Sequence, residues 1–235
     1  IRHFVMDDGW YRSGKESLCG IGTWSVAKEN YPSGLKAFAD SLRSMGFVPG
    51  VWFEFEVVTT DGVTSENEGL LMKFFGKPVM QGPRMFLDFR KKETFDFLMR
   101  KVVAMLKENG IGYMKVDYNA PTATGCDGPD SPAENLRVHM ERVEEFYRRL
   151  KEELPDLVLE ICSSGGHRLS PAWMRIASMG SFSDAHEGIE IPVIAAPSAL
   201  LVPMRRNQIW AVLRKDDSPR RLIYSLCAGF MGRLC

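Results

Sequence analysis

Short apolar runs alternate with amphipathic segments along most of the chain. Apolar residues recur at spacings of three and four, as in helices, in segments 34–45, 65–75, 92–109, 131–154, 171–177 and 219–228. Shorter runs, typical of buried strands, lie at 1–6, 48–54, 85–88, 112–116, 157–161, 180–183, 200–202 and 230–234. A further apolar segment, 189–196, follows a glycine-containing loop. Ser65 with Glu68 predicts a capped helix start, and Gly110 predicts the end of the helix at 92–109.

The order of these elements predicts the fold. Alternating strands and helices are typical of a parallel sheet, and eight such strands in 235 residues predict an α/β fold, a closed (β/α)8 TIM barrel. No repeat, linker or low-complexity segment divides the chain, so residues 1–235 are expected to form a single barrel domain. A doubly wound open sheet is the alternative, but its usual Gly-x-Gly-x-x-Gly or P-loop signal is missing.

Composition and charge narrow the class of protein. Lys and Arg total 30 and Asp and Glu total 30, so a nucleic-acid partner, which would favour a basic excess, is not expected. No run of about 18 apolar residues exists, so no membrane span is expected. The 5 cysteines have an odd count and no CxxC pair, which disfavours a disulfide framework and indicates a reducing, cytoplasmic compartment. The first residue is Ile1 and the last is Cys235, both in apolar runs, so we expect a fragment of a longer protein.

Polar side chains recur where the predicted strands end. They are Asp7 and Asp8, Glu54 and Glu56, Asp88, Lys115 and Asp117, Cys162, and Asp184. Any one of these acids alone would more often be a helix cap or a loop charge. In a barrel, however, the carboxyl ends of all strands meet at one mouth, where catalytic residues lie. The sequence therefore predicts an active site made from these residues.

The segment Lys115-Val116-Asp117-Tyr118-Asn119 is the sharpest of these signals. Alternation along a strand puts Lys115 and Asp117 on the same side of the sheet. A lysine beside a carboxylate favours its ionised form, which a glycosidase nucleophile requires. Asn119 is a candidate donor to a substrate hydroxyl. A salt bridge at the end of the strand, without catalysis, is the alternative.

Asp184 is the candidate general acid of the site. It lies in Ser183-Asp184-Ala185-His186-Glu187, so Glu187 is a local competitor for the same role. His186 is more simply a solvated or capping residue than a ligand, and the histidines show no metal-ligand spacing.

The segment from Cys162 to Arg168 is a glycine-rich turn after a strand. Gly165 and Gly166 allow backbone N–H groups to approach a ligand closely, as in a phosphate-binding loop, but the lysine of a P-loop is missing. Cys162 as a nucleophile beside His167 is a second alternative, without an evident third group to orient the pair. Arg168 is the better candidate for an anchoring side chain.

Three tryptophans near loops, Trp10, Trp24 and Trp52, are candidate platforms for a sugar ring. Packing in the hydrophobic core is the alternative for each of them.

These motifs, in this order, resemble the catalytic barrel of glycoside hydrolase family 36, which includes the bacterial and plant-type α-galactosidases. The resemblance covers nearly the whole chain. The matching segments are Asp-Asp-Gly-Trp at 7–10, Gly-Val-Trp-Phe-Glu-Phe-Glu at 50–56, Leu-Asp-Phe at 87–89, Lys-Val-Asp-Tyr-Asn at 115–119, Cys-Ser-Ser-Gly-Gly-His-Arg at 162–168, and Ser-Asp at 183–184.

The resemblance implies a retaining α-galactosidase in which Asp117 is the nucleophile and Asp184 the acid/base. It implies that Asp7, Asp8 and Lys115 hold the galactose hydroxyls and that Cys162, Gly165, Gly166 and Arg168 line the same subsite. Trp10, Trp52 and Asn119, which are candidates from their positions, complete the expected substrate-binding set. Two carboxylates suffice for this chemistry, so no cofactor or metal is expected. The family also carries β-sandwich domains on either side of the barrel. The expected partner is an α-galactoside, and the full-length protein is expected to form a homo-oligomer.

The chain departs from the family pattern at three places. Glu187 and Ser170 stand where the family usually has aspartate, and the segment 205–208 differs from common members. Both catalytic carboxylates are kept, so these departures bear on substrate preference. The alternatives are an α-N-acetylgalactosaminidase or transglycosylase of the same family, a non-catalytic sugar-binding barrel, and a metal-dependent hydrolase using Asp7, Asp8 and histidines.

Overall fold

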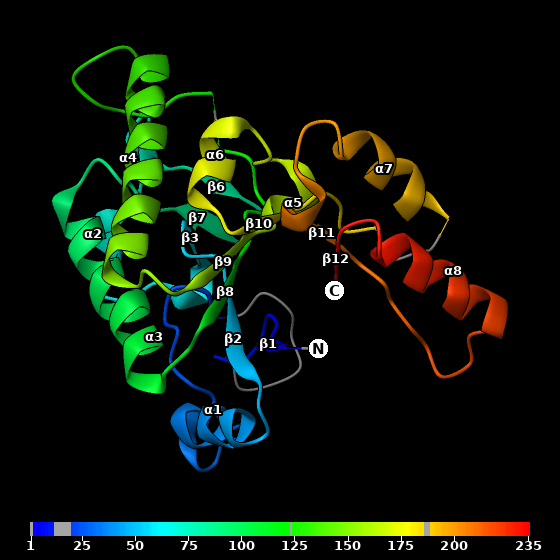
Figure 1. Cartoon of the computed structure of the whole chain (residues 1–235). Coiled ribbons are helices and arrows are strands. Elements are labelled where there is room, and N and C mark those ends of the chain that lie inside the picture. Colours follow the sequence, from blue (N-terminus) through cyan, green and yellow to red (C-terminus); the bar gives the residue numbers. More distant parts are fainter. Residues whose placement is uncertain (1, 12–19, 123, 186–188) are drawn as a thin grey trace. The chain divides into compact units, whose positions relative to one another are not determined.

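The computed structural model describes residues 2–11, 20–122, 124–185 and 189–235 (Figure 1). The chain forms two compact units. Unit 1 comprises Ile1–Met114 and Tyr118–Leu157, and unit 2 comprises Lys115–Asp117 and Val158–Cys235. Strand β8 (Tyr113–Val116) is divided between them, because its first two residues belong to unit 1 and its last two to unit 2.

The sheet of unit 1 contains β1 (His3–Met6), β2 (Val48–Phe53) and the first half of β8, in that order. β1 and β2 are parallel, with His3 opposite Val48 and Met6 opposite Val51. The N–H of Gly112 continues the hydrogen bonding by donating to Pro49 O at 3.0 Å. The strands predicted at 1–6, 48–54 and 112–116 are therefore confirmed, and Pro49 and Gly50 do not interrupt the second of them.

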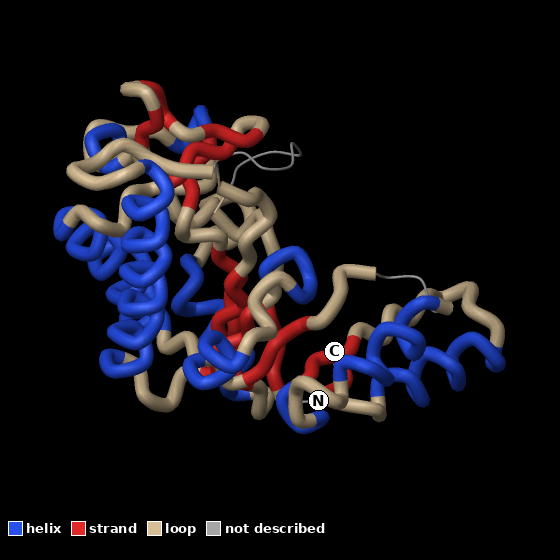
Figure 2. The backbone as a smooth tube through the Cα atoms, turned by 90° about the horizontal axis from the view of Figure 1, so that it is seen from above, coloured by secondary structure: helices blue, strands red, loops and turns tan. Residues whose placement is uncertain are grey.

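The helices of unit 1 are α1 (Gly34–Ser44), α2 (Lys92–Leu98), α3 (Ala104–Asn109) and α4 (Pro132–Glu153). A π-helical turn, Met99–Val103, joins α2 to α3, and Gly110 closes α3 with a φ of +63°. The Ser131 side chain accepts the N–H of Glu134 and caps α4. Helices α2, α3 and α4 run side by side (Figures 1 and 2), and the rings of Phe95 and Phe146 lie 5.4 Å apart between them. These predicted helices are confirmed.

The helix predicted over residues 65–75 is wrong. The segment forms one 3₁₀ turn, Glu68–Leu70, and then strand β4 (Lys73–Phe74), which pairs with β5 (Lys77–Pro78). The Asn67 side chain accepts the N–H of Thr64 at 2.9 Å and donates to Gly62 O at 3.0 Å. These local hydrogen bonds compete with a helix start and fix a turn instead.

The strand predicted at 85–88 exists but runs in an antiparallel sheet. This sheet has the order β3 (Val57–Thr59), β7 (Arg84–Phe86), β6 (Met80–Gln81), and a 3₁₀ turn over Thr60–Gly62 follows β3. Because β6 and β7 are joined by the turn 82–83, their pairing is a hairpin and is necessarily antiparallel. The direction predicted for this strand, parallel to the others, is therefore wrong.

The sheet of unit 2 continues from the second half of β8 through β9 (Val158–Ile161), β10 (Met179–Ser181), β11 (Asn207–Ile209) and β12 (Arg233–Leu234). The neighbouring strands from β9 to β12 pair in parallel. The predicted strands at 157–161, 180–183 and 230–234 are confirmed, the last with only two paired residues. A parallel sheet is thus present in each unit, and the closed eight-strand barrel stays a prediction.

The strand predicted at 200–202 is wrong, because Leu200 and Leu201 lie in an exposed turn. A 3₁₀ turn, Met204–Arg206, follows, and the strand itself is β11, which begins with the polar pair Asn207 and Gln208. The hydrophobic pattern predicted the strand in the wrong place, because the first two buried residues of β11 are polar.

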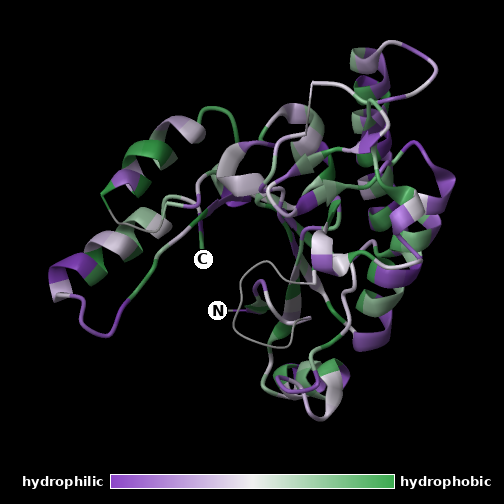
Figure 3. Ribbon diagram, turned by 180° about the vertical axis from the view of Figure 1, so that it is seen from behind, coloured by the Kyte–Doolittle hydropathy of each residue, from purple (hydrophilic) through white to green (hydrophobic). Residues whose placement is uncertain are grey.

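The helices of unit 2 are α5 (Ser163–Gly166), α6 (Pro171–Ile176), α7 (Glu190–Ser198) and α8 (Pro219–Gly229). A small core of Phe182, Ile191, Ala195, Ile209 and Ala228 joins α7 and α8 to the sheet. Hydrophobic residues also continue along the outside of α7 (Figure 3), where Val193 is 72% exposed. Within the described residues, no helix has both the length and the apolar character needed to cross a membrane.

Candidate functional site

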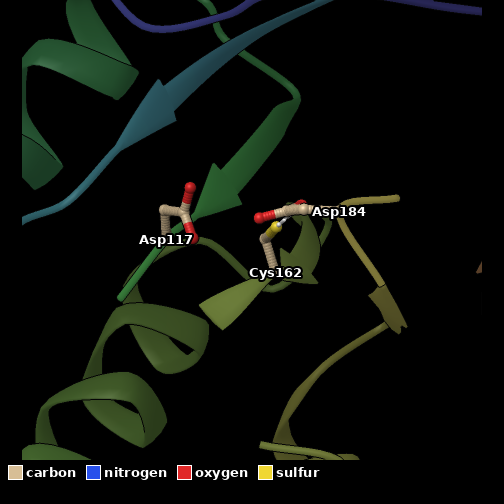
Figure 4. Close-up of side chains that lie close together, drawn as sticks. All are labelled: Asp117, Cys162 and Asp184. Atoms are coloured by element: carbon tan, nitrogen blue, oxygen red, sulfur yellow. Dashed lines mark hydrogen bonds between the residues drawn. The ribbon is translucent and has the colours of Figure 1, made fainter. Parts of the chain in front are cut away.

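The side chains of Asp117, Cys162 and Asp184 gather at one point of unit 2 (Figure 4). They follow β8, β9 and β10, so the carboxyl ends of three strands supply them. One carboxylate oxygen of each aspartate and the Cys162 sulfur all lie within 4.8 Å of one another. Asp117 is 7% exposed and Cys162 1% exposed, whereas Asp184 is open to solvent.

Each carboxylate receives a hydrogen bond from the segment after β9. The N–H of Ser164 donates to Asp117 Oδ1 at 3.0 Å, and the Cys162 thiol donates to Asp184 Oδ1 at 3.3 Å. Burial, followed by the negative charge of Asp117, raises the pKa of the Cys162 thiol far above its ordinary value of 9.0. Cys162 is thus a protonated donor, which opposes its role as a nucleophile, because only the thiolate attacks.

The turn Ser163–Gly166 brings these donors into place through an unusual backbone. Ser163, Ser164, Gly165 and Gly166 have φ values of +51°, +53°, +68° and +109°. Such left-handed geometry costs a non-glycine residue on the order of 1–2 kcal/mol. A Cβ atom on Gly165 would lie 2.3 Å from the N atom of Asp184, so only glycine allows the turn to approach the 183–184 backbone.

Replacing Gly165 by alanine should therefore damage the site. We expect Gly165→Ala to lower the free energy of unfolding by about 2–4 kcal/mol, from backbone strain plus overpacking, and to reduce activity by displacing Asp184. Gly46→Ala is the matched control, because Gly46 has a φ of +85° and open space around its Cα atom. Urea unfolding and kcat measurements should show strain in both variants and lost activity only in Gly165→Ala. Equal activity in the two variants would contradict the close approach.

Lys115 and Arg168, two predicted site residues of unit 2, are both buried against tryptophan rings. The Nζ atom of Lys115 lies 4.8 Å from the centroid of the Trp210 ring. The Cζ atom of Arg168 lies 4.3 Å from that of Trp173. Their exposed fractions are 6% and 3%, so each cation is held against an aromatic face rather than in water.

Sequence reasoning did not single out Trp210, Ser164 or Ser181. The indole Nε1 of Trp210 donates to Ser181 Oγ at 3.3 Å, and Ser164 contributes only its backbone N–H. A backbone N–H donor cannot be predicted from the type of residue that carries it. Trp210 directly follows β11, so a correct prediction of that strand would have placed Trp210 at a strand end, where site residues are expected.

Asp7 and Asp8, in unit 1, lie beside a surface cavity of about 590 Å³ whose lining includes Trp10 and Tyr31. Asp7 Oδ1 accepts the N–H of Asp8 at 2.8 Å, and the Tyr11 hydroxyl donates to Asp8 Oδ1 at 2.6 Å. The two acids are thus fixed at the end of β1.

The three predicted tryptophan platforms belong to the core of unit 1. Trp10, Trp24 and Trp52 are 2%, 4% and 2% exposed. Trp10 Nε1 donates to Trp52 O at 2.7 Å, which holds the end of β1 to β2. Such low exposure fits core packing, the alternative considered for each, and the role of Trp10 and Trp52 as sugar platforms stays a prediction.

Glu54 organises the loop that carries Asn119. It is fully buried, pairs with Arg84 at 3.0 Å, and accepts the backbone N–H of Asn119 at 2.8 Å. Glu56, two residues on, accepts from the Tyr147 hydroxyl at 3.2 Å. Both acids between β2 and β3 are therefore engaged in hydrogen bonds that stabilise unit 1.

Asp88 forms a buried ion pair in unit 1. Arg90 Nε and Nη2 donate to its two oxygens at 2.9 and 2.7 Å, and Nη2 also donates to Asp127 O at 2.7 Å. Burial raises the pKa of Asp88, but the hydrogen bonds and charge of Arg90 outweigh it and leave the pKa below its ordinary value of 3.8. A carboxylate with a depressed folded-state pKa stabilises the fold above its ordinary pKa, and this stabilisation is lost as the pH falls through the folded-state value.

We expect Arg90→Met to lower the free energy of unfolding by about 3–5 kcal/mol at pH 7, because it leaves a buried carboxylate without its partner. Burial would then raise the pKa of Asp88, so the deficit should shrink as the pH is lowered and the variant's Asp88 becomes protonated. Arg137→Met is the control, because Arg137 pairs with Glu134 on the exposed surface at 2.7 Å, and this variant should leave the free energy of unfolding nearly unchanged at every pH. Urea unfolding between pH 3.5 and 7 measures both, and a pH-independent deficit would contradict this role.

The cluster of Asp117, Cys162 and Asp184 is also the one group of three potential metal ligands among the described residues. Cysteine binds metal as the thiolate, and the raised pKa of Cys162 disfavours that form. Asp117 and Asp184 alone make a sparse ligand set. In unit 1 the buried His139 accepts the N–H of Phe89 through Nδ1 at 3.3 Å, so this nitrogen is already used. His186 and Glu187, predicted as alternatives, lie outside the described residues.

The model of one known protein family, Melibiase, matches residues 1–212. The chain belongs to the Melibiase family. The resemblance deduced from the sequence motifs is thereby confirmed.

Curated and solved relatives of this Melibiase chain are α-galactosidases. One from Lactobacillus acidophilus is 30% identical over 209 residues, which is 86% of this chain but 28% of the relative. The crystal structure of an α-galactosidase from Lactobacillus brevis has a TM-score of 0.89 and 25% identity, covering 100% of this chain and 33% of that one. A GH36 α-galactosidase variant from Geobacillus stearothermophilus, in complex with raffinose, has a TM-score of 0.88 and 21% identity over 34% of its length, which shows the shared fold alone.

Proposed function

We propose that this chain is the catalytic part of a retaining glycoside hydrolase that releases terminal α-linked galactose from galactosides. The observation that carries the proposal is the distance between carboxylate oxygens of Asp117 and Asp184, which is at most 4.8 Å. Retaining glycosidases hold their two carboxyl groups about 5–5.5 Å apart, whereas inverting enzymes leave about 6.5–9.5 Å for a water molecule. The spacing therefore supports double displacement.

In the first step, an oxygen of Asp117 forms a bond to the anomeric carbon while the glycosidic bond breaks. Asp184 gives its proton to the departing oxygen. In the second step, Asp184 takes a proton from water, and the water oxygen displaces Asp117 and restores the α configuration. Burial suits Asp117, which must meet the sugar away from water, and exposure suits Asp184, which must meet the aglycone and then water.

Galactoside specificity is supported by the Melibiase relatives. Within the proposal, the substrate-binding residues are those predicted from the sequence and the resemblance, namely Asp7, Asp8, Trp10, Trp52, Lys115, Asn119, Cys162, Gly165, Gly166 and Arg168. We also propose that the two units are parts of one closed (β/α)8 barrel. This barrel would act within a longer, cytoplasmic and homo-oligomeric protein with flanking β-sandwich domains.

The test is a panel of 4-nitrophenyl glycosides with α-galactose, α-N-acetylgalactosamine and β-galactose. We expect turnover of the α-galactoside, with α-galactose as the first product in a time course followed by proton NMR. β-Galactose as first product would refute retention. Preference for the acetamido sugar would favour an α-N-acetylgalactosaminidase, and dominant transfer to sugar acceptors would favour a transglycosylase. Loss of turnover with a chelator would favour a metal-dependent hydrolase. Tight galactose binding without turnover would favour a non-catalytic barrel.

A further inference from the structure

Trp210 contacts the strands of both proposed catalytic carboxylates. It directly follows β11, and its ring packs against the apolar core formed with α7 and α8. One face of the ring lies 4.8 Å from Lys115 Nζ on β8. Its Nε1 donates to Ser181 Oγ, at the end of β10, at 3.3 Å. A single side chain therefore meets the strand before Asp117 and the strand before Asp184.

On the Asp184 side, two serine hydroxyls continue the contact. Ser181 Oγ donates to the carbonyl oxygen of Ser183 at 3.4 Å, and Ser183 Oγ accepts the N–H of Ala185 at 3.0 Å. These bonds fix the backbone immediately before and after Asp184. The indole N–H fixes the Ser181 hydroxyl in turn, because an oxygen that accepts from Trp210 directs its own proton elsewhere.

On the Asp117 side, the contact is with a cation. Lys115 and Asp117 are two residues apart on one strand, so their side chains share one side of the sheet. Lys115 is 6% exposed as a residue, and tryptophan is the strongest aromatic partner for a buried cation. The face of the Trp210 ring therefore restricts the positions that the Lys115 ammonium can take beside Asp117.

On the basis of the proposed function, we propose that Trp210 is a positioning residue that fixes the positions of Lys115 and Asp184 relative to each other. It acts through its ring face on Lys115 and through its N–H and Ser181 on Asp184. A residue present only to fill the core would need neither a polar N–H nor a cation on its face. Phenylalanine or leucine would serve that purpose equally well.

The two contacts can be separated with four variants of the whole chain. Trp210→Phe keeps an aromatic face but loses the N–H, Ser181→Ala loses the acceptor, Trp210→Leu loses both contacts, and the fourth combines Trp210→Phe with Ser181→Ala. We measure kcat/KM for 4-nitrophenyl α-galactoside, which scarcely needs an acid, and for methyl α-galactoside, whose leaving group needs protonation.

We expect Trp210→Phe and Ser181→Ala each to lower kcat/KM about 10-fold for the methyl galactoside and little for the nitrophenyl galactoside. The double variant should lose no more than either single variant, because both remove one interaction. Trp210→Leu should lower kcat/KM on both substrates, because Lys115 is proposed to hold the sugar that they share. Ser178→Ala is the matched control, since its hydroxyl, next to the same strand, only accepts the N–H of Leu159 at 3.1 Å.

Additive losses, or equal losses on both substrates in Trp210→Phe and Ser181→Ala, would overturn the positioning role while leaving the proposed function intact. A wild-type chain that binds galactose but hydrolyses neither galactoside would overturn both. Urea unfolding midpoints of all variants separate these outcomes from simple loss of the folded state.

Discussion

Replacing Asp117 by glycine is expected to reduce kcat by about 10⁴-fold or more on every α-galactoside, including those with good leaving groups. Asp117 forms the covalent bond to the sugar in the proposed mechanism, and no leaving group compensates for a missing nucleophile. Asp216→Gly is the matched control, because Asp216 lies exposed in a turn of unit 2 and should keep full activity. The measurement is the initial rate with nitrophenyl and methyl α-galactosides.

A small anion can occupy the space that Asp117→Gly vacates. Azide would then attack the anomeric carbon from the face on which Asp117 stood, and the product would be the β-galactosyl azide. NMR of the product gives its configuration. An α-galactosyl azide would mean that the roles of Asp117 and Asp184 are exchanged.

Replacing Asp184 by alanine is expected to have a different signature, with the loss depending on the leaving group. For methyl α-galactoside, kcat/KM should fall by about 10²- to 10⁴-fold, the usual contribution of a general acid. For 4-nitrophenyl α-galactoside, bond cleavage should persist while hydrolysis of the glycosyl-enzyme becomes slow. A burst of nitrophenol followed by a slow steady state, with intact-protein mass spectrometry showing one added galactosyl group, would demonstrate this.

Azide should rescue Asp184→Ala with retained configuration, since it attacks the glycosyl-enzyme from the open face and gives the α-galactosyl azide. Asp216→Ala, the matched control, should show neither a burst nor any azide effect. If both Asp117→Gly and Asp184→Ala kept near-normal turnover, the assignment would be wrong, and Glu187 would be the next acid to replace.

The sequence predicted most of the helices because their signals are local. The Ser131 cap, Pro132 and the apolar spacing of α4 all act within one segment, and Gly110 ends α3 as its position indicated. The failures lie where other forces decide. Asn67 draws the chain into a turn through hydrogen bonds that a hydrophobic pattern does not contain. β11 is a strand although it begins with Asn207 and Gln208, because position in the sheet outweighed hydrophobicity.

For the site, motifs placed Asp117, Cys162 and Asp184 at strand ends, and the structure of unit 2 brings the three together. The sequence did not indicate which groups hold these three side chains in position. The donor to Asp117 is a backbone N–H, and the contacts of Trp210 are with two strands distant in sequence. The residue types therefore predicted the reactive groups of the site, whereas their hydrogen-bond and cation–π partners could be found only from the fold.

The left-handed turn after β9 also constrains how this sequence can drift. Ser163 and Ser164 adopt positive φ values at a steric cost that glycine would not incur, and the buried Ser163 hydroxyl has no hydrogen-bond partner among the described residues. Replacement of Ser163 by glycine should therefore be tolerated without loss of stability. Exchange in the other direction at Gly165 or Gly166 meets the backbone of residues 182–184. Mutational drift at this turn should therefore be uneven, with exchange between serine and glycine tolerated at Ser163 and side chains other than hydrogen excluded at Gly165 and Gly166.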